Sequence, residues 1–89
     1  MVRVDVIISN ELGLHARAAA RFVEAAARFT CEVWLSKDGH KVNGKSIMGI
    51  LTLAAARGEK VTIEVEGVNE TMALAELKVL IEGGFGEKR

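Results

Sequence analysis

His15 stands where a glycine-bearing loop gives way to an alanine-rich segment, and Arg17 follows two residues later. If a helix begins at Ala16, His15 lies at a helix N-terminus, where unpaired backbone N–H groups carry about half a positive charge. This potential disfavours a second positive charge, and the N–H groups can hold an anion attached to the ring. The pattern favours a histidine that accepts and releases a phosphoryl group, with the Arg17 guanidinium on the phosphoryl oxygens.

The residues alone leave simpler alternatives open. A lone histidine at a helix start is usually a loop residue or a weak cap. The spacing of His15, His40 and Cys31 shows no close pairs of metal ligands, so neither a metal ion nor a cofactor is expected. A set of nucleophile, base and acid is not evident either, which leaves open whether the protein is an enzyme in its own right.

Alternation and helical spacing of apolar residues predict the elements that would position this histidine. Strands are expected over 2–8, 31–36, 41–43 and 61–66, with an Asp-Gly hairpin turn at 38–39. Helices are expected over 16–28, after Ser46 as N-cap, and after Asn69 as N-cap as far as the glycines at 83 and 84.

The order βαββαβα and the polar alternate positions of the strands predict the fold class. A sheet with one wet face favours antiparallel strands with the helices on the other side, which is a two-layer α+β sandwich. Trp34 falls in register with the wet face, and we expect an isolated, exposed aromatic partly covered by its neighbours.

Length and composition exclude several classes of protein. The 89 residues allow one domain, and twelve basic residues balance twelve acidic ones. Neither nucleic-acid binding nor membrane insertion is expected, because there is no net positive charge and no long apolar run. The single cysteine, Cys31, fits a reducing compartment, so a cytoplasmic location is expected.

Two motifs, "GLHAR" at 13–17 and "KSIMGIL" at 45–51, resemble the signature regions of the HPr family. These proteins are the histidine-containing phosphocarriers of the bacterial phosphoenolpyruvate-dependent phosphotransferase system, and the resemblance covers nearly the whole chain. It implies a single HPr domain over 1–89 with an open-faced, four-stranded antiparallel β-sandwich and three helices on one face.

The resemblance also implies a function. His15 would take a phosphoryl group from phosphorylated enzyme I through Nδ1 and pass it to an enzyme IIA-type domain. Arg17 matches the arginine that stabilises the phosphate in the family. Ser46 matches the serine that HPr kinase/phosphorylase modifies in many bacteria.

The chain departs from the usual family pattern at several positions. Ala18 stands where sugar-transport members have proline, and "LHARA" and "GGF" are closer to the nitrogen-related branch. The choice between the sugar and nitrogen branches, the IIA partner and the presence of a Ser46 kinase therefore stay open. Glu24 and Ala27 replace residues that are often basic and face enzyme I, a role that Arg21 and Arg28 are expected to take over.

A docking patch for these partners is expected on the second helix. The family match favours exposure of Ile47, Met48 and Leu51, whereas Ile50 and Leu53 are assigned to the core. Methionine adapts to different surfaces, which suits a protein that meets several partners transiently. From the first helix, Ala16 and Ala20 are expected to contact partners, and the protein is expected to be a monomer.

Two rival functions remain as alternatives to phosphotransfer. A ferredoxin-like RNA-binding domain would share the element order but needs a basic face and stacking aromatics, and Trp34 is the one candidate. A small regulatory module that binds a ligand needs a glycine-rich pocket loop, at which only "VNGKSIMG" hints.

Overall fold

Four strands and three helices follow one another in the order that the sequence predicts. The structure, a computed structural model, describes residues 1–87. Its elements are β1 (Val2–Ile7), α1 (Ala16–Ala27), β2 (Glu32–Lys37), β3 (His40–Asn43), α2 (Ile47–Leu51), β4 (Lys60–Glu66), α3 (Glu70–Glu82) and a 3₁₀ turn (Gly84–Gly86). The expected element boundaries differ from these by a residue or two, as is usual where element ends fray.

The strands form one antiparallel sheet in the order β1-β4-β2-β3. The register places apolar residues opposite one another, and Ile63 of β4 pairs with both Val4 and Leu35. Since the side chains of a strand alternate between faces, this register collects the apolar residues on a single face.

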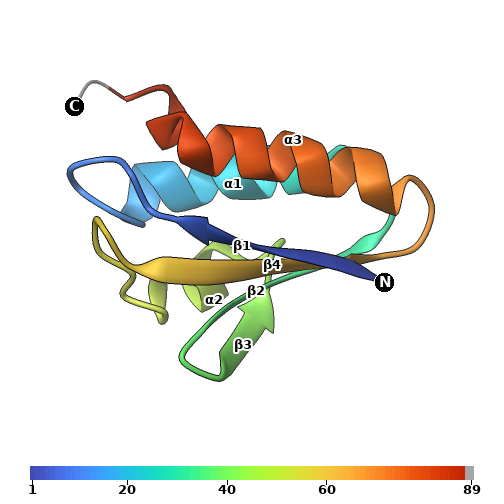
Figure 1. Cartoon of the computed structure of the whole chain (residues 1–89), viewed down its shortest axis with the longest axis horizontal. Helices are drawn as coiled ribbons and strands as arrows, with labels where there is room; N and C mark the ends of the chain where they lie inside the picture. Colours follow the sequence, from blue (N-terminus) through green and yellow to red (C-terminus); the bar gives the residue numbers. More distant parts are fainter. Residues whose placement is uncertain (88–89) are drawn as a thin grey trace.

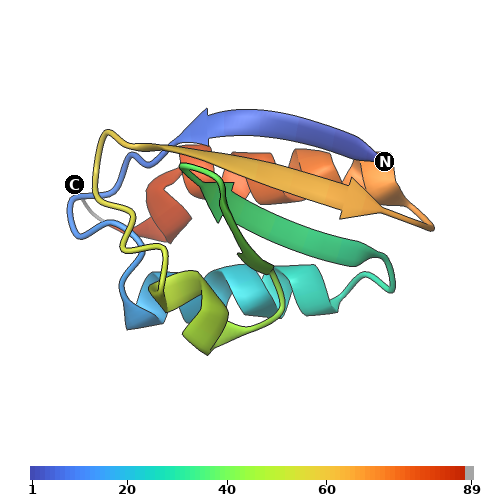
Figure 2. The same ribbon diagram turned by 90° about the horizontal axis from the view of Figure 1, so that it is seen from below.

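Helices α1 and α3 lie along that apolar face (Figure 1), and α2 packs against α1 beside β3. Phe22 of α1, Leu77 of α3 and Leu35 of β2 are fully buried between these layers. In Figure 2 the strands lie in front of α3. The exposed polar residues that alternate along the strands lie on the face of the sheet away from it. The open-faced α+β sandwich is therefore confirmed.

The open face of the sheet holds Trp34 as expected. The Lys41 ammonium lies 5.1 Å from the ring centroid and 3.5 Å from a carboxylate oxygen of Glu64. The ring is half-buried under these neighbours, which confirms a locally covered aromatic. His40 is exposed in β3, with Nε2 3.2 Å from the Thr52 hydroxyl, and Cys31 is buried in the core.

The start of α3 corrects one expectation. Asn69 occupies the N-cap position, but its backbone is left-handed (φ 62°) and its side chain makes no capping hydrogen bond. The Glu70 carboxylate instead accepts a hydrogen bond from the Gly67 N–H at 3.0 Å and lies 3.5 Å from the amino terminus. The hydrogen bond from the Gly67 N–H holds the pKa of Glu70 below its usual value. The positive amino terminus lowers this pKa further, by a smaller amount, and partial burial opposes both effects.

This lowered pKa predicts acid sensitivity at the start of α3. Above the unfolded pKa of about 4.3, the ionised carboxylate makes its full contribution to the free energy of unfolding. This contribution is lost as the pH falls through the lower folded pKa. We expect Glu70→Gln, which keeps an acceptor but does not titrate, to flatten the loss of stability between about pH 5 and pH 3. Urea unfolding across that range measures the effect. Glu24→Gln, at an exposed position on α1, is the control, and an unchanged curve for Glu70→Gln would contradict the assignment.

Candidate functional site

His15 is the N-cap residue of α1. Its backbone is extended (φ −78°, ψ 178°), and its Nδ1 accepts a hydrogen bond from the Arg17 N–H at 3.2 Å. An acceptor at this position satisfies one of the free N–H groups of the first turn. The expected placement of His15 at the helix start is therefore observed, and Nδ1 is the ring atom that faces the helix N-terminus.

The loop before His15 is fixed by its contacts with the segment that follows α2. Leu14 N–H donates to the Ala55 carbonyl at 2.9 Å. Gly13 has a left-handed φ of 68°, and a Cβ at this position would lie only 2.5 Å from the same carbonyl oxygen. Glycine is therefore required here both for its conformation and for space.

The other ring nitrogen of His15 contacts a residue from the far end of the sequence. Nε2 lies 2.5 Å from Oε2 of Glu87, and Oε1 of the same carboxylate accepts a hydrogen bond from Asn10 Nδ2 at 3.0 Å. The Asn10 amide also donates to the Gly13 carbonyl at 2.7 Å and is completely buried. The Asn10 amide first, and the His15 ring after it, hold the pKa of Glu87 below its usual value against the opposing effect of burial.

The chain end that carries Glu87 is anchored on α1. Phe85 is buried although its backbone is left-handed (φ 57°), and its carbonyl accepts a hydrogen bond from the Arg21 guanidinium. An open cleft of about 460 Å³ lies between this tail and the His15 loop, and its lining residues are Glu11, Leu12, Arg17, Arg21, Gly86 and Glu87. Arg21 is thus engaged by the tail, and Arg28 is paired with Glu76 at 2.9 Å.

Arg17 is exposed in the first turn of α1 and borders the same cleft. Within residues 1–87 its guanidinium makes no hydrogen bond or ion pair. A guanidinium on this cleft, in the first turn of the helix that His15 caps, can take up the oxygens of a phosphoryl group.

Ser46 is the N-cap residue of α2, and its Oγ accepts a hydrogen bond from the Gly49 N–H at 3.0 Å. The neighbouring side chains of Ile47 and Met48 are 39% and 74% exposed, as expected. Leu51 was expected to be exposed too, but it is half-buried, because it packs against the core. On α1, Ala16 is exposed and Ala20 is half-buried. Ile50 and Leu53 are buried, as expected.

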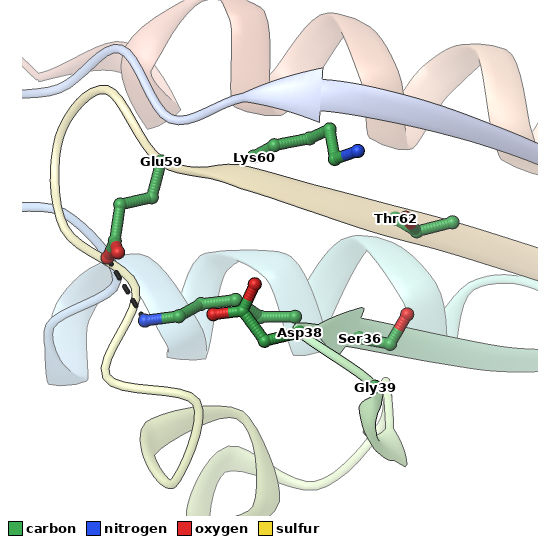
Figure 3. A pocket seen from close by; sticks show the side chains of 7 residues that line it. Ser36, Asp38, Gly39, Glu59, Lys60 and Thr62 are labelled. Atoms are coloured by element: carbon green, nitrogen blue, oxygen red, sulfur yellow. Dashed lines mark hydrogen bonds and ion pairs between the residues drawn. The ribbon is translucent and has the colours of Figure 1, made fainter.

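A second hollow lies at the C-terminal end of β2, between the β2–β3 turn and β4 (Figure 3). Two of its charged groups are paired with each other, because the Lys37 ammonium lies 3.1 Å from the Glu59 carboxylate, and Lys37 also lies 3.2 Å from the Ala54 carbonyl. None of the residues around His15 lines it, so this hollow is separate from the candidate site.

Within residues 1–87 there is no group of three or more histidine, cysteine or acidic residues that could hold a metal ion. Over the same residues, no helix has both the length and the apolar character needed to cross a bilayer.

Comparison with known proteins decides the family. A family model described as "PTS HPr component phosphorylation site" matches residues 2–83. The chain belongs to the HPr family of phosphocarrier proteins of the phosphotransferase system. It is 47% identical over 87 residues to phosphocarrier protein HPr of Neisseria meningitidis serogroup A, which covers 98% of both chains.

Solved HPr structures agree with this fold. HPr-C-His from Thermoanaerobacter tengcongensis is 46% identical, covers 100% of both chains and superposes with a TM-score of 0.95. A structure described as an HPr dimer from the same organism is 47% identical, with coverage of 98% of this chain and 100% of the other, and a TM-score of 0.77. The monomeric state expected for this HPr-family chain therefore remains a prediction.

Sequence reasoning missed Asn10 and Glu87. The segment with Asn10 reads only as a loop, and Glu87 follows a glycine-rich turn with no periodic signal. Their contact spans 77 residues of sequence, so no local pattern could have shown it.

Proposed function

We propose that this HPr-family protein accepts a phosphoryl group on Nδ1 of His15 from phosphorylated enzyme I and passes it to an enzyme IIA-type domain. One observation carries the proposal: His15 caps α1, with Nδ1 3.2 Å from the Arg17 N–H. In this position a phosphoryl group on Nδ1 would meet backbone donors and the positive end of the helix.

The test of this function is direct phosphorylation. With phosphoenolpyruvate and enzyme I, the protein should gain a single phosphate that is labile in acid and stable in alkali, as expected of phosphohistidine. Transfer to a IIA-type domain should then discharge it. Absence of labelling with an active enzyme I would refute the proposal. A shift of labelled RNA by the unphosphorylated protein would instead favour the RNA-binding alternative, which zero net charge disfavours.

Arg17 stabilises the transferred phosphoryl group in this proposal. We expect Arg17→Glu to slow transfer about tenfold or more, since a charge-assisted hydrogen bond to phosphate is replaced by repulsion. The free energy of unfolding should change by only about 0.5 kcal/mol, because the side chain is exposed. Transfer kinetics and thermal unfolding measure the two effects.

Arg57→Glu is the matched control for Arg17, since it makes the same charge change at an exposed position in the loop after α2. It should transfer normally. If Arg17→Glu lost much stability and kept its transfer rate, Arg17 would be a structural residue.

The partners of the protein follow from the same proposal. Enzyme I and the IIA-type domain dock on a patch formed by Ala16, Ala20, Ile47, Met48 and Leu51, next to His15. HPr kinase/phosphorylase modifies Ser46 at the edge of this patch. The protein works in the cytoplasm as a single domain over 1–89. Sugar or nitrogen signalling is decided by the IIA partner.

A further inference from the structure

Two contacts determine where the proton of the His15 ring lies. Nδ1 accepts a hydrogen bond from the Arg17 N–H, so this atom carries a lone pair rather than a proton. Nε2 lies 2.5 Å from a Glu87 carboxylate oxygen, and an ionised carboxylate can only accept. Both contacts are satisfied together only by the neutral ring protonated on Nε2.

The Glu87 carboxylate is held in this position by the loop before His15 and by the contacts of its own tail with α1. Asn10 Nδ2 donates to its second oxygen at 3.0 Å, and the same amide is fixed by the Gly13 carbonyl at 2.7 Å. The preceding tail is anchored by the buried Phe85 ring and by Arg21, which donates to the Phe85 carbonyl. The carboxylate side chain is only 12% exposed, so water competes weakly for it.

We propose that Glu87, aligned by Asn10, is a positioning residue that keeps the His15 proton on Nε2 and so presents the Nδ1 lone pair to the phosphoryl group. This inference rests on the proposed function of His15. A histidine that works through one nitrogen depends on what its other nitrogen contacts, because that contact sets the tautomer and the ring orientation.

The same carboxylate acts during transfer. The Arg17 N–H gives up its hydrogen bond to Nδ1, and the freed lone pair forms a bond to phosphorus. The bond between phosphorus and the donor breaks, and that electron pair leaves with the donor. The ring keeps its Nε2 proton and becomes cationic, with the Glu87 carboxylate 2.5 Å from Nε2. In onward transfer the N–P electron pair returns to the ring, which becomes neutral again. Glu87 therefore stabilises the charge that forms and disappears on the ring.

Glu87→Gln is the sharpest variant, since it keeps the shape and removes the charge. Asn10 donates to one terminal atom of the side chain, and this atom must be the glutamine oxygen. The glutamine NH₂ then faces Nε2, which must accept, so the ring proton is driven to Nδ1 and against the Arg17 N–H. Glu87→Ala removes both interactions, and Glu82→Gln removes a carboxylate at the end of α3 as the control.

Nitrogen-15 NMR of the neutral His15 ring reports the tautomer, and steady-state transfer from phosphorylated enzyme I gives kcat and KM. In the wild type and in Glu82→Gln we expect a protonated Nε2 and an unprotonated Nδ1. In Glu87→Gln the Nδ1–H tautomer should appear and kcat should fall about tenfold, with KM and the melting temperature nearly unchanged. Glu87→Ala should lower kcat in the same direction.

A Glu87→Gln protein with the wild-type tautomer overturns the inference, and so does one with an altered tautomer but a normal kcat. A fall in kcat without a tautomer change overturns it as well, since Glu87 would then act by charge alone. Failure of the proposed function can be distinguished from failure of this inference. In the first case the wild-type protein takes up no phosphate, while the NMR measurement still reports the tautomer of its His15 ring.

Discussion

With phosphoenolpyruvate and enzyme I, His15→Ala should take up no phosphate at all. The ring is the nucleophile, and none of the groups around it can replace it: Arg17 is a cation, Asn10 an amide and Glu87 a carboxylate that already contacts Asn10. Loss of Nδ1 also removes the cap of α1, at a cost of about 1 kcal/mol. His15→Asn separates these effects, because asparagine is a good N-cap and no nucleophile.

The control for His15 is the second histidine of the chain. His40 is exposed in β3, and among the residues that the structure describes its ring forms a hydrogen bond only with the Thr52 hydroxyl. His40→Ala should label at the wild-type rate. Autoradiography of the three variants after acid and alkali treatment gives the result, and labelling of His15→Asn at the wild-type rate would mean that the acceptor lies elsewhere.

Ser46→Asp should fold normally and yet accept phosphate far more slowly. Aspartate can accept the Gly49 N–H as the serine does, so α2 keeps its cap. The new charge lies beside Ile47 and Met48, and a partner that docks there must strip water from it. We expect KM for enzyme I to rise at least about tenfold, or about 1.4 kcal/mol, with a smaller change in kcat. Added salt should relieve the share that is due to repulsion.

Ser46→Asn is the matched control, since asparagine caps as well as aspartate but carries no charge. Ser46→Asn should accept and transfer the phosphoryl group at the normal rate. Ser46→Ala should also transfer normally, but the kinase should be unable to phosphorylate it. The transfer rate is measured against enzyme I concentration. Superimposable curves for Ser46→Asp and Ser46→Asn would reduce Ser46 to a helix cap.

The sheet was predictable because its signal is local. Val61, Ile63 and Val65 alternate with polar residues over one strand, and the observed β4 buries all three. The start of α3 was not predictable in the same way. Asn69 has the residue type of an N-cap, but its left-handed backbone turns the side chain away from the role, and Glu70 bonds back to Gly67 instead. Residue type suggests a cap, but backbone conformation decides whether the bond forms.

The candidate site divides along the same line. His15 and Arg17 were predictable because they lie in one short motif at a helix start. Asn10 and Glu87 were not, because their meeting depends on the packing of a buried Phe85 and on a hydrogen bond from Arg21 across 64 residues of sequence. Two residues that meet from opposite ends of the chain produce no periodic pattern in the sequence, so sequence analysis cannot predict their contact.

The position of Glu87 also has a practical consequence for handling this protein. Glu87 contacts the His15 ring, whereas Met1 lies at the opposite end of the sheet, near the start of α3 (Figure 1). Affinity tags, fluorophores and fusion partners therefore belong at the amino terminus. A fluorophore at an engineered cysteine close to Glu87, in contrast, would serve as a reporter, because the charge on the neighbouring ring changes when it gains or loses its phosphate.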